Sequence, residues 1–134
     1  MNTYNWYAQL TKPSWAPPSW LFGPVWTVLY AIIAVTYGMV FYRAFAGKLS
    51  WLVALPFILN LIFNLIFTPI QFGLKNNWLA AMDILLVVAT LIWALVALWQ
   101  AAPELRWMVY ANLPYLAWGV FATCVQLTIT YLNR

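Results

Sequence analysis

Histidine is absent from this chain of 134 residues, and cysteine and acidic residues are scarce. Its one cysteine, Cys124, excludes an internal disulfide. With two acidic residues and no histidine, the chain has no cluster of typical metal ligands. It also has no glycine-rich phosphate loop and no nucleophile elbow. Hydrolysis, phosphoryl transfer and conventional metal catalysis are therefore not expected. A haem held through histidine is excluded, whereas ligation by Met, Cys or Tyr stays formally open.

Charge is the second scarcity. Charged residues make up 6% of the chain, whereas soluble domains carry about 25%. Hydrophobic residues make up 66%, so we expect an integral membrane protein, of the inner membrane if the source is prokaryotic. The net charge of +4 is spread over the ends of apolar stretches and forms no basic stripe, so nucleic acid is not an expected partner.

Four apolar stretches are long enough to cross a hydrocarbon layer, which needs about 20 residues per helix. Short linkers force neighbouring spans to run antiparallel. The predicted fold is an all-α integral membrane helix bundle, a single domain over residues 1–134. We expect a rigid, proline-rich covering loop at 1–21 and transmembrane helices at 22–45, 51–72, 78–100 and 107–132.

Prolines and cations add two details to these spans. Pro56, Pro69 and Pro114 either bend their helices or are tolerated membrane prolines. The positive-inside rule gives no orientation, because each side of the predicted bundle receives three cations. One side has Lys12, Lys75 and Arg134, and the other has Arg43, Lys48 and Arg106.

Tryptophan is unusually frequent, with ten residues. Those near the ends of spans suit the headgroup region, where amphipathic rings gather. Those deeper in the spans need a partner for the indole N–H and are better candidates for a pocket. The interfacial set is Trp20, Trp51, Trp78, Trp99 and Trp107, and the deeper set is Trp26, Trp93 and Trp118.

At 3.6 residues per turn, polar and aromatic residues align on one face of three spans. An amide that faces lipid would leave its donors unmet, so we expect these faces to point inward. Two interpretations stay open, namely hydrogen bonding between helices and an aromatic cavity whose amides orient a flat ligand. The faces are Trp26, Tyr30 and Tyr37; Asn60, Asn64, Phe67 and Gln71; and Tyr115, Trp118, Ala122 and Gln126.

Asp83 is the acid inside a predicted span. A carboxylate within a membrane is a functional hypothesis by default. Here it also lies near the amino end of its helix, where the helix dipole or Lys75 could stabilise it.

Several motifs together resemble the translocator protein family, also called tryptophan-rich sensory proteins (TspO/MBR) or peripheral-type benzodiazepine receptors. The resemblance covers nearly the whole chain in the right order. Its specific parts are Lys12-Pro13-Ser14-Trp15-Ala16-Pro17-Pro18 and Pro114-Tyr115-Leu116-Ala117-Trp118. Supporting segments are residues 6–10, 24–30, 60–64, 81–87 and 119–123.

The resemblance implies a helical membrane protein that binds porphyrins, and in some members cholesterol or synthetic ligands, under the loop before Trp26. By matching motif it implies pocket roles for Trp26, Trp118, Asn64, Ala122 and, in the covering loop, Tyr7. Together with the inward faces, this gives an expected ligand-binding set of Tyr7, Trp26, Tyr30, Asn64, Phe67, Tyr115, Trp118 and Ala122, with no catalytic or metal residue.

The family usually has five spans, and this chain begins almost at the segment that follows the first. The expected bundle therefore lacks the first helix. One cavity wall would then be open to lipid, filled by a second copy of the chain, or absent because the sequence is shortened.

The expected function is a membrane receptor or sensor for a planar hydrophobic ligand, best met by a porphyrin, in whose sensing, transport or disposal it takes part. No cofactor is required, and the porphyrin is a ligand. The resemblance also leaves open an enzyme activity, light-dependent porphyrin breakdown. The alternatives are a small dimeric proton-coupled exporter that uses Asp83 and a membrane scaffold without ligand. Other expected partners are a homodimer mate, membrane lipid and a sterol, for which residues 127–134 fit a weak pattern.

Overall fold

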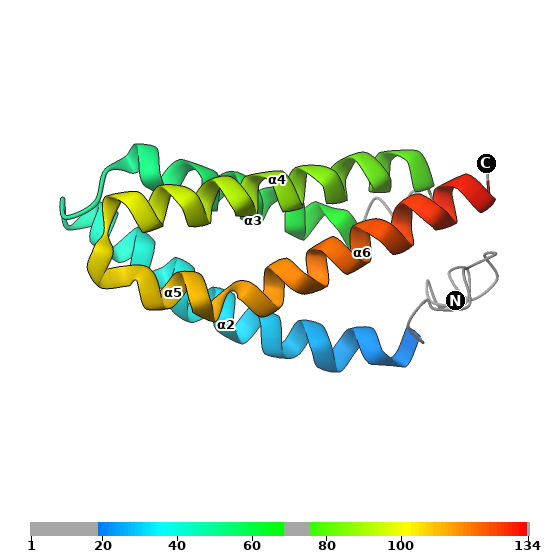
Figure 1. Ribbon diagram of the computed structural model, residues 1–134, viewed down its shortest axis with the longest axis horizontal. Helices are drawn as coiled ribbons and strands as arrows, with labels where there is room; N and C mark the ends of the chain where they lie inside the picture. The colour runs from blue at the N-terminus through cyan, green and yellow to red at the C-terminus, as the bar shows by residue number, and fades with distance from the viewer. Residues whose placement is uncertain (1–18, 69–75, 134) are drawn as a thin grey trace.

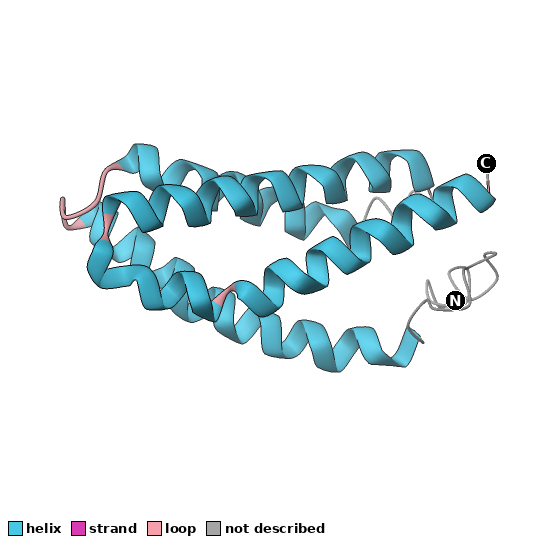
Figure 2. Cartoon of the chain, in the orientation of Figure 1, coloured by secondary structure: helices cyan, strands magenta, loops and turns pink. Residues whose placement is uncertain are grey.

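The computed structural model describes residues 19–68 and 76–133. Within these ranges the chain is helical and contains no strand, which confirms the all-α bundle (Figure 2). The elements are α2 (Ser19–Phe45), α3 (Trp51–Thr68), α4 (Asn77–Ala101), the short 3-10 helix η2 (Pro103–Leu105), α5 (Arg106–Ala111) and α6 (Leu113–Leu132).

Three of these helices are long and apolar enough to cross a membrane. They are Gly23–Phe45 within α2, Asn77–Ala101 and Leu113–Leu132, and Trp51–Phe67 within α3 is a shorter apolar helix. The expected third span, 78–100, lies within α4. The last four residues of the expected second span, 69–72, lie outside the described residues, as do Pro69, Gln71 and the covering loop through residue 18.

Local chemistry explains where helices begin and end. Gly47 adopts φ 74°, a left-handed conformation that suits glycine, and the Lys48 N–H bonds the Arg43 carbonyl at 2.8 Å to close α2. Asn76 caps α4, since its side-chain oxygen accepts the Leu79 N–H at 3.0 Å. These signals set the short turn between α2 and α3 and the start of α4.

The bundle is not uniformly packed. Helix α3 lies along α4, and α4 lies along α6, whereas α2 contacts α3 and α5 over shorter stretches. In Figure 1, α6 crosses obliquely between α4 and α2, and its carboxyl end diverges from the amino end of α2. We conclude that α3, α4 and α6 form the tightly packed part, with α2 held more loosely against it.

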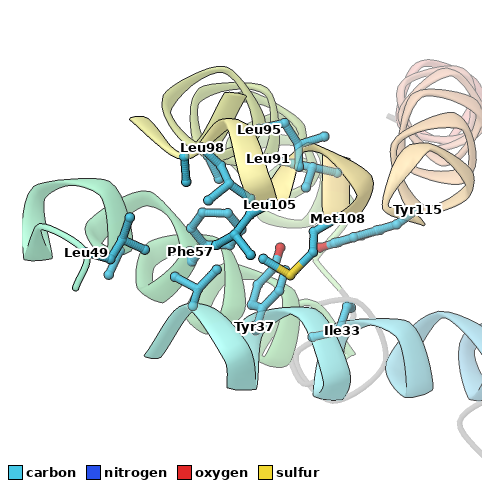
Figure 3. Close-up of a cluster of buried hydrophobic side chains, with 14 of the residues drawn as sticks. Ile33, Tyr37, Leu49, Phe57, Leu91, Leu95, Leu98, Leu105, Met108 and Tyr115 are labelled. Carbon is cyan, nitrogen blue, oxygen red and sulfur yellow. The ribbon is translucent and has the colours of Figure 1, made fainter. Parts of the chain in front are cut away.

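The apolar core lies between α2, α3 and α4 and extends to η2 and α5 at one end of the bundle (Figure 3). Tyr37 and Phe57 pack edge to face with ring centroids 4.9 Å apart, and Met108 is fully buried. At the same end, Arg43 of α2 and Glu104 of η2 form an ion pair at 3.4 Å. This end of the bundle is thus closed by both apolar packing and charge.

The expected last span, 107–132, is not one continuous helix. It breaks at Asn112 into α5 and α6, because Pro114 has no N–H with which to continue the ladder of α5. The fully buried Asn112 side chain bonds the Met108 carbonyl at 2.8 Å and the Thr36 hydroxyl at 3.1 Å. Of the two alternatives left open for Pro114, the structure shows an interrupted helix, and the Asn112 side chain links the break to α2.

Candidate ligand-binding site

Asn60 is the centre of a buried hydrogen-bond network that joins four helices. Its Oδ1 accepts the hydroxyl of Tyr37 at 2.6 Å and that of Tyr115 at 3.0 Å. Its Nδ2 donates to the Val87 carbonyl at 2.8 Å and the Thr90 hydroxyl at 3.2 Å. The residue is fully buried, so its amide points inward and serves hydrogen bonding between helices.

Asn64, one turn further along α3, has different surroundings. Its Oδ1 accepts the Tyr30 hydroxyl at 2.8 Å, and its Nδ2 donates to the Tyr115 hydroxyl at 2.7 Å. The amide is 5% exposed, whereas Tyr30 is 39% exposed. Asn64 therefore links the loosely held α2 to α6 through a tyrosine that borders the surface.

Trp26 extends this group along α2. Its ring centroid lies 5.4 Å from that of Tyr30 and 6.2 Å from that of Tyr115, the latter edge to face. The structure thus brings together four of the expected ligand-binding residues, Trp26, Tyr30, Asn64 and Tyr115. We call these four the α2–α6 cluster.

Three other expected residues, Phe67, Trp118 and Ala122, are half-buried and pack against the same apolar core. Trp118 also contacts Phe121, with ring centroids 5.6 Å apart. Tyr7 lies outside the described residues.

Gln126 belongs to the predicted face of Tyr115, Trp118 and Ala122, but its hydrogen bonds differ from those of Tyr115. Its Nε2 donates to the Asn77 carbonyl at 3.4 Å and to the Thr130 hydroxyl at 3.2 Å. These bonds fasten the carboxyl end of α6 to the start of α4. Gln126 thus serves helix association at a distance from Asn64.

The prediction of which tryptophans are interfacial and which are pocket-forming fails at one position, Trp93. Trp93 is 46% exposed on α4, so its assignment to the deeper, pocket-forming set was wrong. Its neighbours Leu91, Ala94 and Leu95 take the buried positions of that turn. Trp51, Trp78 and Trp107 are exposed, as interfacial residues are, and the side chain of Trp20 lies outside the described residues.

Asp83 is buried, at 4% exposure, and its Oδ2 has no hydrogen-bond partner among the described residues. It lies six residues after Asn77 and therefore beyond the first turn of α4. The effect of the helix dipole is largest within that first turn. With Val87 and Thr90 it follows the i, i+4, i+7 spacing of a single helix face, the face that bonds Asn60. The same spacing in the sequence could have placed Thr90 and Asp83 with the network.

Comparison of the sequence with known proteins identifies its family. The sequence model of the TspO/MBR family matches residues 1–132. This chain belongs to the TspO/MBR family. "Tryptophan-rich protein TspO" of Bacillus cereus is 36% identical over 129 residues, which cover 96% of this chain and 80% of the relative. The human "Translocator protein" is 37% identical over 124 residues, covering 90% and 70% of the two chains. "Protein CrtK" of Rhodobacter capsulatus is 29% identical over 128 residues, covering 96% and 78%.

Membership of the TspO/MBR family confirms the resemblance stated from the motifs, and with it the membrane location. The three long apolar helices agree with that location. Within the described part of this TspO/MBR chain, the α2–α6 cluster combines aromatic rings and a buried amide with a partly exposed side chain, Tyr30, which the Asn60 network lacks. It is therefore the candidate site for a hydrophobic molecule.

Proposed function

We propose that this TspO/MBR protein binds a planar hydrophobic molecule of the porphyrin class between α2 and α6, and takes part in its sensing, transport or disposal. The observation that carries the proposal is the position of Asn64. Its buried amide lies between the hydroxyls of Tyr30 and Tyr115, and both tyrosine rings contact the indole ring of Trp26. Flat apolar faces with a few polar groups that fix orientation are the usual composition of a small-molecule site.

For a flat molecule to enter this cluster, α2 has to move away from α3 and α6. The Tyr30–Asn64 bond must open, which costs about 0.6 kcal/mol for a typical hydrogen bond between membrane helices. Each new aromatic contact with the ligand returns about 0.5–1.5 kcal/mol beyond its buried area. Two or more such contacts outweigh the lost bond, so Tyr30 is expected to act as the movable side of the site.

The test is a titration of the purified protein with protoporphyrin, followed by tryptophan quenching. We expect saturable quenching for the wild type. Trp26→Phe should weaken affinity about fivefold, because a smaller ring loses about 1 kcal/mol of contact. The matched control is Trp93→Phe, an exposed tryptophan of α4, which should change affinity by less than about twofold. Unsaturable quenching in the wild type, or equal effects of both variants, would contradict the proposal.

A second candidate, a proton-coupled exporter working as a homodimer, is favoured by Asp83. A buried carboxyl without a described partner, on the helix face that bonds Asn60, is the kind of group that can exchange a proton inside a membrane. In vesicles with an imposed pH gradient, Asp83→Asn should then abolish proton-linked efflux of protoporphyrin. Glu104→Gln is the control, because Glu104 is 60% exposed at one end of the bundle. If the rate of protoporphyrin efflux by the wild type does not depend on the pH gradient, this candidate function is rejected.

A further inference from the structure

An apolar groove lies away from the α2–α6 cluster. It is formed by the carboxyl third of α4, the end of α5 and the start of α6. Its volume is about 290 Å³. Several of its walls face outward, since Ile92 is 47% exposed, Val96 50% and Leu113 44%. The lining residues are Ile92, Leu95, Val96, Trp99, Gln100, Val109, Leu113 and Leu116.

The length of the groove along α4 is close to the thickness of one leaflet of a bilayer. From Gln100 to Ile92 it follows eight residues of α4, or about 12 Å at 1.5 Å per residue. Half of a hydrocarbon core is about 15 Å thick. The break at Asn112 lies on the opposite wall, between Val109 of α5 and Leu113 of α6. The groove thus runs inward from the end of α4 through roughly one layer of acyl chains.

A cation is fixed at the outer end of this groove. The guanidinium of Arg106 lies 4.5 Å from the centroid of the Trp99 ring, and its Nε donates to the Trp99 carbonyl at 3.0 Å. Tyr110 packs edge to face on the same ring, with centroids 5.7 Å apart. These contacts hold Arg106 beside a lining residue of the groove.

The charge of Arg106 is not compensated in the part of the chain that the structure describes. Of the two acidic residues in the sequence, Glu104 pairs with Arg43. Asp83 lies near the other end of α4, about 24 Å from Trp99 along the helix. The described residues also offer no hydrogen-bond acceptor to the two terminal nitrogens of Arg106. Its outer fork remains available to an anion.

We propose that this groove binds an anionic phospholipid, with one acyl chain against α4 and α6 and the phosphate on Arg106. A guanidinium matches a phosphate in a bidentate manner, and the interface is where tryptophan and arginine gather. A second copy docked through the same groove about a two-fold axis would bring two uncompensated Arg106 side chains together. That repulsion disfavours a dimer here, whereas an anionic lipid satisfies both the charge and the apolar wall.

The experiment measures lipid retention by native mass spectrometry. The full chain is reconstituted in vesicles of phosphatidylcholine and phosphatidylglycerol, extracted in detergent and weighed with its bound lipids. We expect the wild type to retain phosphatidylglycerol preferentially. Arg106→Gln should reduce that preference about fivefold, the value of one interfacial cation. Lys48→Gln, an exposed cation at the same end of the bundle, should leave it unchanged.

A second pair of variants tests the groove itself without altering Arg106. Val96→Trp fills the groove and should displace phosphatidylglycerol, whereas Val35→Trp, at 61% exposed on α2, should not. Equal retention of both lipids by the wild type, or unchanged retention in Arg106→Gln or Val96→Trp, overturns the proposal. A dimer that is lost specifically in Val96→Trp also overturns it, because the groove would then be a contact between copies.

Discussion

Asn60 and Asn64 lie one turn apart on α3, yet they have different tasks. Asn60 is enclosed by side chains and a carbonyl from α2, α4 and α6. Asn64 shares Tyr115 with it but reaches the surface side through Tyr30. Because an unmet amide is costly in the apolar interior, both asparagines bind helices together. The exposure of Tyr30 is what distinguishes Asn64 from Asn60 as the candidate site for a ligand.

The hydroxyl of Tyr37 provides the residue-scale prediction. It donates to Asn60 at 2.6 Å from a side chain that is 2% exposed. Tyr37→Phe should lower the free energy of unfolding by about 1 kcal/mol, because the bond is lost and an Asn60 lone pair loses a donor. Denaturation of the purified protein in mild detergent measures this. Tyr42→Phe is the control on the same helix, since Tyr42 is 70% exposed. Equal stability of the two variants would refute the structural role of Tyr37.

At the scale of elements, much of the arrangement could be predicted from the sequence. Hydrophobic run length places α2 and α4, and breakers such as Gly47 place a turn. The split of the final span into α5 and α6 could not be predicted with the same certainty. A proline in a membrane span is compatible with either a bend or an intact helix, and the bond from Asn112 to Thr36 that accompanies the break joins residues 76 apart in the sequence.

Helix faces could be predicted where aromatic or polar residues recur at helical spacing, but not for a single residue such as Trp93. The spacing of Trp26 and Tyr30, and of Asn60 and Asn64, gives the faces that meet in the structure. Trp93 was placed wrongly because position along a span says how deep a residue lies, but not which way it points. Apart from the face with Asp83 and Thr90, the sides of α4 are apolar, so periodicity gives little contrast around Trp93. The groove beside Arg106 could not be predicted from the sequence either. It forms between α4 and the two helices that meet at the break at Asn112.

At the scale of the whole molecule, composition sets the environment and a few polar side chains set the fold within it. Lipid provides no hydrophobic force to gather helices, so interhelical hydrogen bonds and close packing must do so. In this chain the Asn60 network gathers α3, α4 and α6, and α2 is attached through Tyr37, Tyr30 and Thr36. Under the proposed function, the smaller contact of α2 with the other helices would let it move to admit a flat ligand.

The proposed function depends on the Asn64 amide, which would orient a flat hydrophobic ligand between α2 and α6. The protoporphyrin affinity of Asn64→Leu tests this role. We expect Asn64→Leu to lose about tenfold in affinity, because a single unmade hydrogen bond in an apolar site costs about 1–3 kcal/mol. Gln100→Leu, an amide replacement on the outer face of α4, should leave affinity within about twofold of the wild type. Binding by folded Asn64→Leu as tight as that of the wild type would contradict the account.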